Sequence, residues 1–193
     1  MRQTMQTLAL DSATIRAALA AKGVITLHYA AGVDDACRFL RAGALLADQH
    51  PGHVFLDPVD VHARERRRNK CGPVLFVLHA AILRTDAARA AGVCRAAPSA
   101  WAGRTHDECW FADGGALARG FTVGRHEQMV VIRDCGGRLP FGGHLMQVLV
   151  DPAVDAWPGV EAAWDRLRQA GAEGGLAVPL LRRSCEPGCG CAP

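Results

Sequence analysis

The chain has 193 residues, half of them hydrophobic, and a formal net charge of +3. This length predicts one domain with a substantial core, and so small a charge does not by itself indicate a nucleic-acid-binding protein. The longest strongly apolar run, residues 74–83, contains His79 and is far shorter than the ~20 residues of a membrane-spanning helix, so no membrane span is expected.

The start of the chain does not resemble a secretory signal, because Asp11 and Arg16 interrupt it before a continuous apolar stretch forms. Eight cysteines are present, most of them scattered through ordinary segments. Without a secretory signal, reduced thiols are the simpler interpretation of these cysteines. We therefore expect a cytoplasmic protein without membrane attachment.

The first half of the chain alternates helices and strands. Asp11 and Ser12 form a helix N-cap signal, and Gly23 is the expected stop. The stretch 73–79 is apolar on both faces, which is typical of a fully buried strand. The expected helices are 12–22, 33–42 and 80–92, the expected strands are 24–30, 53–57 and 73–79, and a short helix or loop is expected at 58–68.

The second half is less regular, with an irregular stretch at 93–108. Short strands are expected at 109–112 and 121–123, longer ones at 127–134 and 144–151, and a helix at 157–171. The connections are too irregular for a repeated strand–helix–strand series, so the expected class is α+β. We expect one domain over 1–180 and a cysteine-rich, flexible tail over 181–193.

The common signatures for phosphate, dinucleotide and hydrolase sites are absent from the sequence, and so is a paired C-x-x-C. Three other features occur in order: "LHY" (27–29), "HVFLD" (53–57) followed by a basic stretch, and "RHEQMVV" (125–131). Between them, "VDDACRFLRAGAL" (33–45) reads as a short amphipathic helix closed by glycine.

This order resembles the ADP-ribosyltransferase superfamily, in its His-Tyr-Glu branch, and within it the small bacterial toxin-like, DarT-like members. The resemblance covers roughly residues 24–150. It implies a split two-sheet core with flanking short helices that binds NAD, as a substrate, in a cleft between the sheets. It also implies transfer of ADP-ribose to a macromolecular acceptor, a nucleic-acid base or a protein side chain. A toxin or defence role would add an antitoxin or immunity partner.

The reaction gives each matched residue a role. Breaking the nicotinamide–ribose bond passes through an oxocarbenium-like state, as in glycoside hydrolysis. The resemblance implies that His28 binds a ribose hydroxyl and that the neighbouring Tyr29 packs beside the cofactor. Phe55 is the candidate for stacking on nicotinamide. Arg64 or Arg68 would pair with the pyrophosphate.

Two adjacent residues compete for the catalytic position. By strict register Gln128 occupies the place of the family's glutamate, whereas a slip of one residue puts Glu127 there and reverses the face on which it lies. We expect Glu127 to act, because a neutral amide cannot supply the charge that stabilises the oxocarbenium state. Gln128 in that place would suit an inactive relative.

The basic stretch "RERRRNK" (64–70) carries five positive charges against Glu65. It is either a solvated loop or a contact surface for the phosphates of a DNA or RNA acceptor. Two alternative functions remain open. One is an NAD-using RNA 2′-phosphotransferase-like enzyme, which depends on histidine and arginine rather than glutamate. The other is a catalytically inactive nucleic-acid-binding relative.

Metal binding is not expected from the sequence. His50 and His53 share a Pro-Gly turn, which is a poor spacing for two ligands, whether or not His62 joins them. The tail "CEPGCGCAP" (185–193) has the spacing C-x3-C-x-C and is one ligand short of a structural zinc site unless Cys94 or Cys135 completes it. We therefore predict no metal site.

Overall fold

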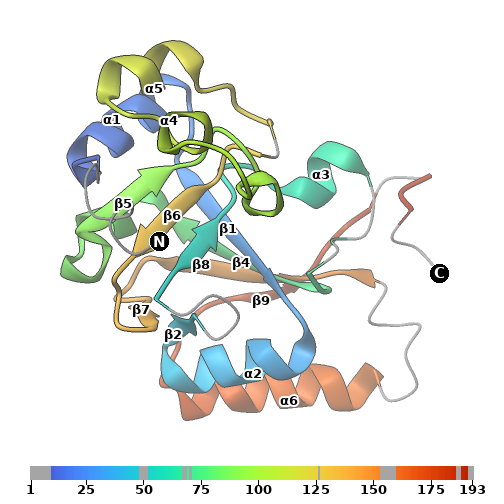
Figure 1. The fold of residues 1–193 in the computed structure, drawn as a ribbon. Helices are drawn as coiled ribbons and strands as arrows, with labels where there is room; N and C mark the ends of the chain where they lie inside the picture. The colour runs from blue at the N-terminus through green and yellow to red at the C-terminus, as the bar shows by residue number, and fades with distance from the viewer. Residues whose placement is uncertain are drawn as a thin grey trace.

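The computed structural model describes residues 10–47, 52–66, 69, 71–125, 127–152, 160–185 and 188–190. Over these residues the chain folds into three sheets, of four, three and two strands, with helices packed around them (Figure 1). The expected α+β class is confirmed, and a small two-stranded sheet accompanies the two larger ones.

The four-stranded sheet has the order β1-β4-β8-β9. Its strands are β1 (Thr26–Ala31), β4 (Val74–His79), β8 (Leu145–Val150) and β9 (Leu180–Arg182). All neighbours are antiparallel except β8 and β9. Every residue of β4 except the last is buried, as its apolar sequence predicts for a strand covered on both faces.

Two helices, α2 (Val33–Ala42) and α6 (Val160–Glu173), lie side by side against this sheet (Figure 1). The buried residues of α2 follow helical spacing, so one face enters the core. The segment that follows α6 also comes close to α2, at Gly174. A Cβ atom on Gly174 would lie 1.9 Å from the carbonyl oxygen of Leu40, so only glycine fits there.

The three-stranded sheet has the order β3-β6-β5, formed by β3 (Val54–Leu56), β6 (Val130–Arg133) and β5 (Ala90–Val93). One face joins the main core under α1 (Ser12–Ala21) and α5 (Gly114–Gly120). The other face carries a smaller apolar cluster, formed by Phe55, Cys94, Trp101, Cys109, Trp110 and Val131. The strands β2 (Ala44–Leu46) and β7 (Arg138–Pro140) form the third sheet.

The helix expected at 80–92 was wrong. Residues 80–84 and 86–88 form the 3₁₀ turns η1 (Ala80–Arg84) and η2 (Asp86–Ala88), and β5 follows directly. The alanine-rich sequence favours a helix locally, but pairing of β5 with β6 overrides that preference. Gly92 also lets Trp110 approach, because a Cβ atom there would lie 3.0 Å from the indole ring.

Other local expectations also changed. Residues 121–123 do not form a strand, and 109–112 contributes only the bridge between Cys94 and Trp110. The helix α5 was not expected. Asp113 caps it by accepting a hydrogen bond of 2.7 Å from the backbone N–H of Ala116. The short helix α4 (His106–Cys109) lies in the stretch expected to be irregular.

The C-terminal segment was expected to be a flexible tail beginning at residue 181, but that boundary falls inside β9. Two backbone hydrogen bonds hold the described part of the segment to the domain, from Arg183 to Val150 and from Gly190 to Arg66, both 2.8 Å long. Cys189 is buried. These contacts fix the segment beside α3 (Val61–Glu65). Over the described ranges, the helices are all too short or too polar to cross a membrane.

Candidate functional site

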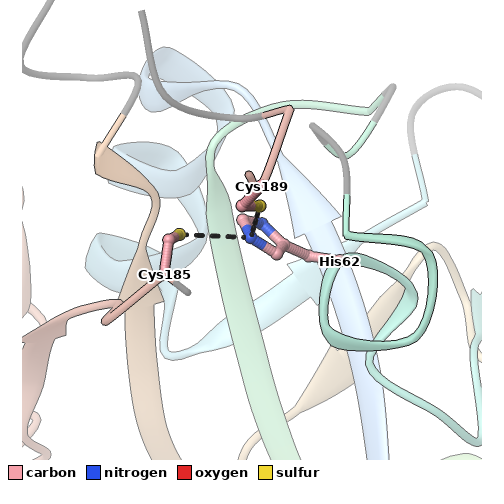
Figure 2. Close-up of side chains that lie close together, drawn as sticks. All are labelled: His62, Cys185 and Cys189. Carbon is pink, nitrogen blue, oxygen red and sulfur yellow. Dashed lines mark hydrogen bonds between the residues drawn. The ribbon is translucent and has the colours of Figure 1, made fainter. Parts of the chain in front are cut away.

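The described part of the tail brings two cysteines to a buried histidine. His62 lies on α3, whose N-terminus is capped by the carboxylate of Asp60. The Nε2 atom of His62 lies 3.3 Å from the Sγ atom of Cys185 and 3.2 Å from that of Cys189. Figure 2 shows both sulfur atoms directed at the same ring nitrogen, from a segment more than 120 residues away in the chain. We call these three residues the His-Cys-Cys cluster.

The opposite ring nitrogen of His62 faces a carboxylate. Its Nδ1 atom lies 3.0 Å from the Oδ2 atom of Asp151, a close approach that falls short of good hydrogen-bond geometry. Arg183 holds this carboxylate from the other side by donating a hydrogen bond of 2.7 Å from Nε to Oδ1. Arg183 also contacts Asp60. A buried polar network therefore joins α3 to the ends of β8 and β9.

This arrangement offers a possible metal site where none was expected. Imidazole nitrogen and thiolate sulfur are the ligands that zinc prefers, and the three ligand atoms of the cluster lie within 4.8 Å of one another. His62 and the tail cysteines had been paired with other candidate ligands, His62 with His50 and His53 and the cysteines with Cys94 or Cys135. Their sequence separation gave no signal that β9 would bring the tail to α3.

The second feature is a junction where β1 meets β3, linking the four-stranded and three-stranded sheets. His28 and Asp57 exchange two backbone hydrogen bonds, of 2.8 and 2.9 Å. Residues directly opposite each other in such a pair project their side chains from the same face. The His28 imidazole and the Asp57 carboxyl therefore share one face of this β1–β3 junction.

The hydrogen bonds of His28 indicate its protonation. The Nδ1 atom lies 3.2 Å from the carbonyl oxygen of Asp57, so Nδ1 carries the proton. Burial lowers the pKa of the His28 ring, which keeps the ring neutral at neutral pH. The Nε2 atom is then an acceptor, and the hydroxyl of Thr26 lies 3.4 Å from it.

Asp57 was not singled out by the sequence analysis, although it ends the motif "HVFLD". Burial raises the pKa of its carboxyl from 3.8 to about 6, and the nearby acids Asp60 and Glu65 add to this rise. Its Oδ1 atom accepts a hydrogen bond of 3.0 Å from the backbone N–H of Val59. A carboxyl that titrates near neutral pH is suited to proton transfer.

The structure places Glu127 and Gln128 differently. Gln128 is 2% exposed, and its amide closes a loop: its oxygen accepts from the N–H of Thr122 at 2.7 Å and its nitrogen donates to the carbonyl of Gly120 at 3.3 Å. Glu127 is partly exposed, and its carboxylate lies 3.3 Å from Nε of Arg125. The amide of Gln128 is thus used in hydrogen bonds within its own loop, whereas the carboxylate of Glu127 is partly exposed to solvent.

Glu127 lies just before β6, the strand that pairs with β3 next to the junction. Leu56 lies opposite Val130 in the β3–β6 pair, so the start of β6 is one strand away from Asp57. Glu127 lies in the turn that precedes β6, where the backbone N–H of Gln128 donates to the carbonyl of Arg125, and Val131 of β6 lies on the face opposite the main core. Phe55 lies on this face as well, half-buried, with its ring 6.2 Å from that of Trp101.

The remaining predicted residues lie as follows. The ring of Tyr29 packs edge-on against Phe39 of α2, with 5.7 Å between centroids, on the side of β1 opposite His28. Arg64 donates a hydrogen bond of 2.7 Å to the carbonyl of Gly124 and pairs with Glu65. Arg68 lies outside the described residues.

A hollow of about 600 Å³ lies beside the loop that carries Glu127. Its volume is within the range of small-molecule sites. Among its lining residues are three arginines that the sequence analysis did not select: Arg95, Arg104 and Arg125. Arginine pairs well with phosphate oxygens, so this hollow is a second candidate for binding a pyrophosphate, although Asp107 and Glu108 line it as well.

Within the described residues the structure therefore offers a histidine–carboxyl junction, an arginine-lined hollow and a His-Cys-Cys cluster. Comparison with protein-family models, with curated proteins and with solved structures gives no match. The chemistry of these three features is accordingly the basis for the functional argument.

Proposed function

We propose that this protein transfers ADP-ribose from NAD to a macromolecular acceptor at the β1–β3 junction. The observation that carries the proposal is the backbone pair of His28 and Asp57, which sets a neutral imidazole and a carboxyl on one face where two sheets meet. Strand alternation puts Phe55 on the face of β3 that carries Asp57, and Glu127 lies in the turn that leads into the neighbouring strand β6. In this proposal the core is the split two-sheet core of the ADP-ribosyltransferase superfamily.

His28 would fix the ribose. With Nδ1 donating to the carbonyl of Asp57, the Nε2 atom accepts a hydrogen bond from a hydroxyl, and at present the hydroxyl of Thr26 is 3.4 Å away. A ribose hydroxyl would take the place of the threonine hydroxyl. Because burial lowers the pKa of His28, the ring stays an acceptor at neutral pH and adds no positive charge beside the developing oxocarbenium.

The carboxyl groups of Glu127 and Asp57 would have different roles in the reaction. Glu127, partly exposed and ionised, stabilises the positive charge that develops on the ribose as nicotinamide leaves. Asp57, whose pKa is raised to about 6, accepts the proton that the acceptor nucleophile loses. Phe55 and Trp101 offer rings for the nicotinamide, and the arginines of the hollow pair with the pyrophosphate.

The test measures nicotinamide release and transfer of labelled ADP-ribose to separate DNA, RNA and protein pools. Glu127→Gln keeps the size of the side chain and removes its charge, so turnover should fall by about 10²–10³ while NAD binding survives. Glu173→Gln is the matched control, because Glu173 is exposed on α6 and pairs with Arg41. It should leave turnover unchanged.

Wild-type protein that releases no nicotinamide with any pool would overturn the proposal. Turnover that needs His28 but survives Glu127→Gln, with transfer of an RNA 2′-phosphate, would favour the phosphotransferase alternative. Salt-sensitive DNA or RNA binding without NAD turnover would favour the inactive binding protein.

A further inference from the structure

We propose that His62, Cys185 and Cys189 bind a zinc ion that fastens the C-terminal segment to α3. The three ligand atoms already converge, lying within 4.8 Å of one another. They come from segments far apart in the chain, as Figure 2 shows. This inference is independent of the proposed transferase activity.

More sulfur atoms lie beside the Nε2 atom of His62 than this atom can bind through hydrogen bonds. The Nε2 atom of a neutral imidazole has one lone pair and accepts one S–H group, yet two sulfur atoms lie 3.3 and 3.2 Å from it. A tetrahedral zinc with bonds of ~2.0 Å to nitrogen and ~2.3 Å to sulfur separates the two ligand atoms by about 3.6 Å. The two nitrogen–sulfur distances would therefore change by only a few tenths of an ångström when the ion binds.

The surroundings of the cluster provide a second observation. Histidine ligands of metals usually present their other ring nitrogen to a carboxylate, which fixes the ring and raises its basicity. In this structure Nδ1 of His62 lies 3.0 Å from Asp151, and both side chains are about 4% exposed or less. Arg183 in turn holds Asp151. The imidazole is thus oriented so that its Nε2 lone pair faces the sulfur atoms.

The ligand types select the metal. Two thiolates and one imidazole suit zinc, whereas calcium and magnesium require oxygen ligands. Binding would release the two thiol protons, and Zn²⁺ would offset the charge of the thiolates in a buried site. The cluster supplies three of the four ligands of a structural zinc site.

The position of the site indicates its role. His62 and Cys189 are both buried, which suits a structural ion rather than a catalytic ion that must meet substrate. The ion would link α3 to the end of the chain, where Gly190 already donates a backbone hydrogen bond to Arg66. Free energy of metal binding would then stabilise the docked segment.

The first experiment measures the zinc content of the full chain, purified without chelators. We expect about one zinc ion per chain, and loss of that ion in Cys185→Ser and Cys189→Ser. Cys71→Ser is the matched control, because Cys71 is exposed and is not a member of the cluster. The control should keep its zinc.

A second measurement does not depend on variants that fold. After zinc is removed, Co²⁺ should give a thiolate-to-cobalt charge-transfer band, and zinc should abolish it. In the zinc-loaded protein, Cys185 and Cys189 should resist alkylation until a chelator is added. Wild-type protein that holds almost no zinc and gives no cobalt band would overturn the proposal. So would equal alkylation with and without chelator, or equal loss of zinc in Cys71→Ser.

Discussion

His28 and His62 are two histidines in neighbouring parts of the structure whose different partners prepare them for different chemistry. The Nδ1 atom of His28 faces a backbone carbonyl, and its Nε2 atom faces a hydroxyl. In His62 the same two atoms face a carboxylate and two sulfur atoms. A carbonyl partner leaves a neutral hydrogen-bond acceptor, whereas a carboxylate partner strengthens the ring as a ligand for a cation.

The two regions are also linked. The charges of Asp60 and Arg183 act on the pKa of His28, and the same two side chains belong to the network that holds His62. The β1–β3 junction and the His-Cys-Cys cluster are therefore neighbours. Their roles can be separated only by variants that change one of them and leave the other intact.

The largest effect is expected from Asp151→Asn, which should weaken zinc binding but not NAD binding. This change removes the charge behind His62, so zinc affinity should fall about 10–100-fold. NAD binding should hardly change, because Arg183 keeps its contact with Asp60. The measurement is competition between the protein and a chelator of known affinity. Asp165→Asn, which alters an exposed pair with Arg168, is the control. Unchanged zinc affinity would leave Asp151 only the role of holding Arg183.

The opposite result is expected from His28→Asn, which should weaken NAD binding but not zinc binding. Asparagine retains a donor for the carbonyl of Asp57 but lacks the Nε2 acceptor, so NAD affinity should fall about tenfold, as expected for one lost hydrogen bond. Zinc content should stay unchanged. The readout is the rise in Tm caused by NAD. His79→Asn is the control, since His79 caps η1 through Nδ1, which asparagine imitates. An equal loss in both variants would remove the special role of His28.

A smaller effect is expected from the titration of Asp57. Its pKa is raised from 3.8 to about 6, so between these values the native state holds more protons than the unfolded state. The contribution of Asp57 to stability therefore improves as the pH falls through this window and is unfavourable above it. Asp57→Asn keeps the acceptor for Val59 and should stabilise the protein by about 1 kcal/mol at pH ~7.5, after allowance for solvent.

The measurement is urea unfolding of wild type and Asp57→Asn at several pH values. The advantage of the variant should shrink towards the unfolded pKa. Asp86→Asn serves as a control, because Asp86 lies in an exposed pair with Arg89. A difference in unfolding free energy that stays constant across the pH range would mean that burial does not raise the pKa of the Asp57 carboxyl.

The smallest effect concerns the basic stretch of residues 64–70. Replacing Arg66 and Arg67 by alanine should flatten the salt dependence of nucleic-acid binding by roughly one log–log unit per lost phosphate contact. NAD and zinc binding should be unaffected. Filter binding over a salt series gives the slope. The same slope in variant and wild type would assign residues 64–70 to a solvated loop.

Much of the fold followed from local patterns. The buried strand β4 and the amphipathic helix α2 carry their environment in their own periodicity, and both were predicted within a few residues. The stretch 80–92 was not, because its alanines favour a helix while its place beside β6 requires β5. Propensity describes a segment alone, and sheet pairing depends on a partner that the segment does not contain.

The candidate site divides in the same way. Residue type and spacing were enough to predict that His28 lies on an apolar strand and that Glu127 and Gln128 precede another. That Gln128 closes a loop and that His28 faces Asp57 follows from the folded chain, not from local patterns. The tertiary structure alone brought Cys185 and Cys189 to His62. Each of these outcomes depends on contacts between distant segments, which sequence periodicity does not encode.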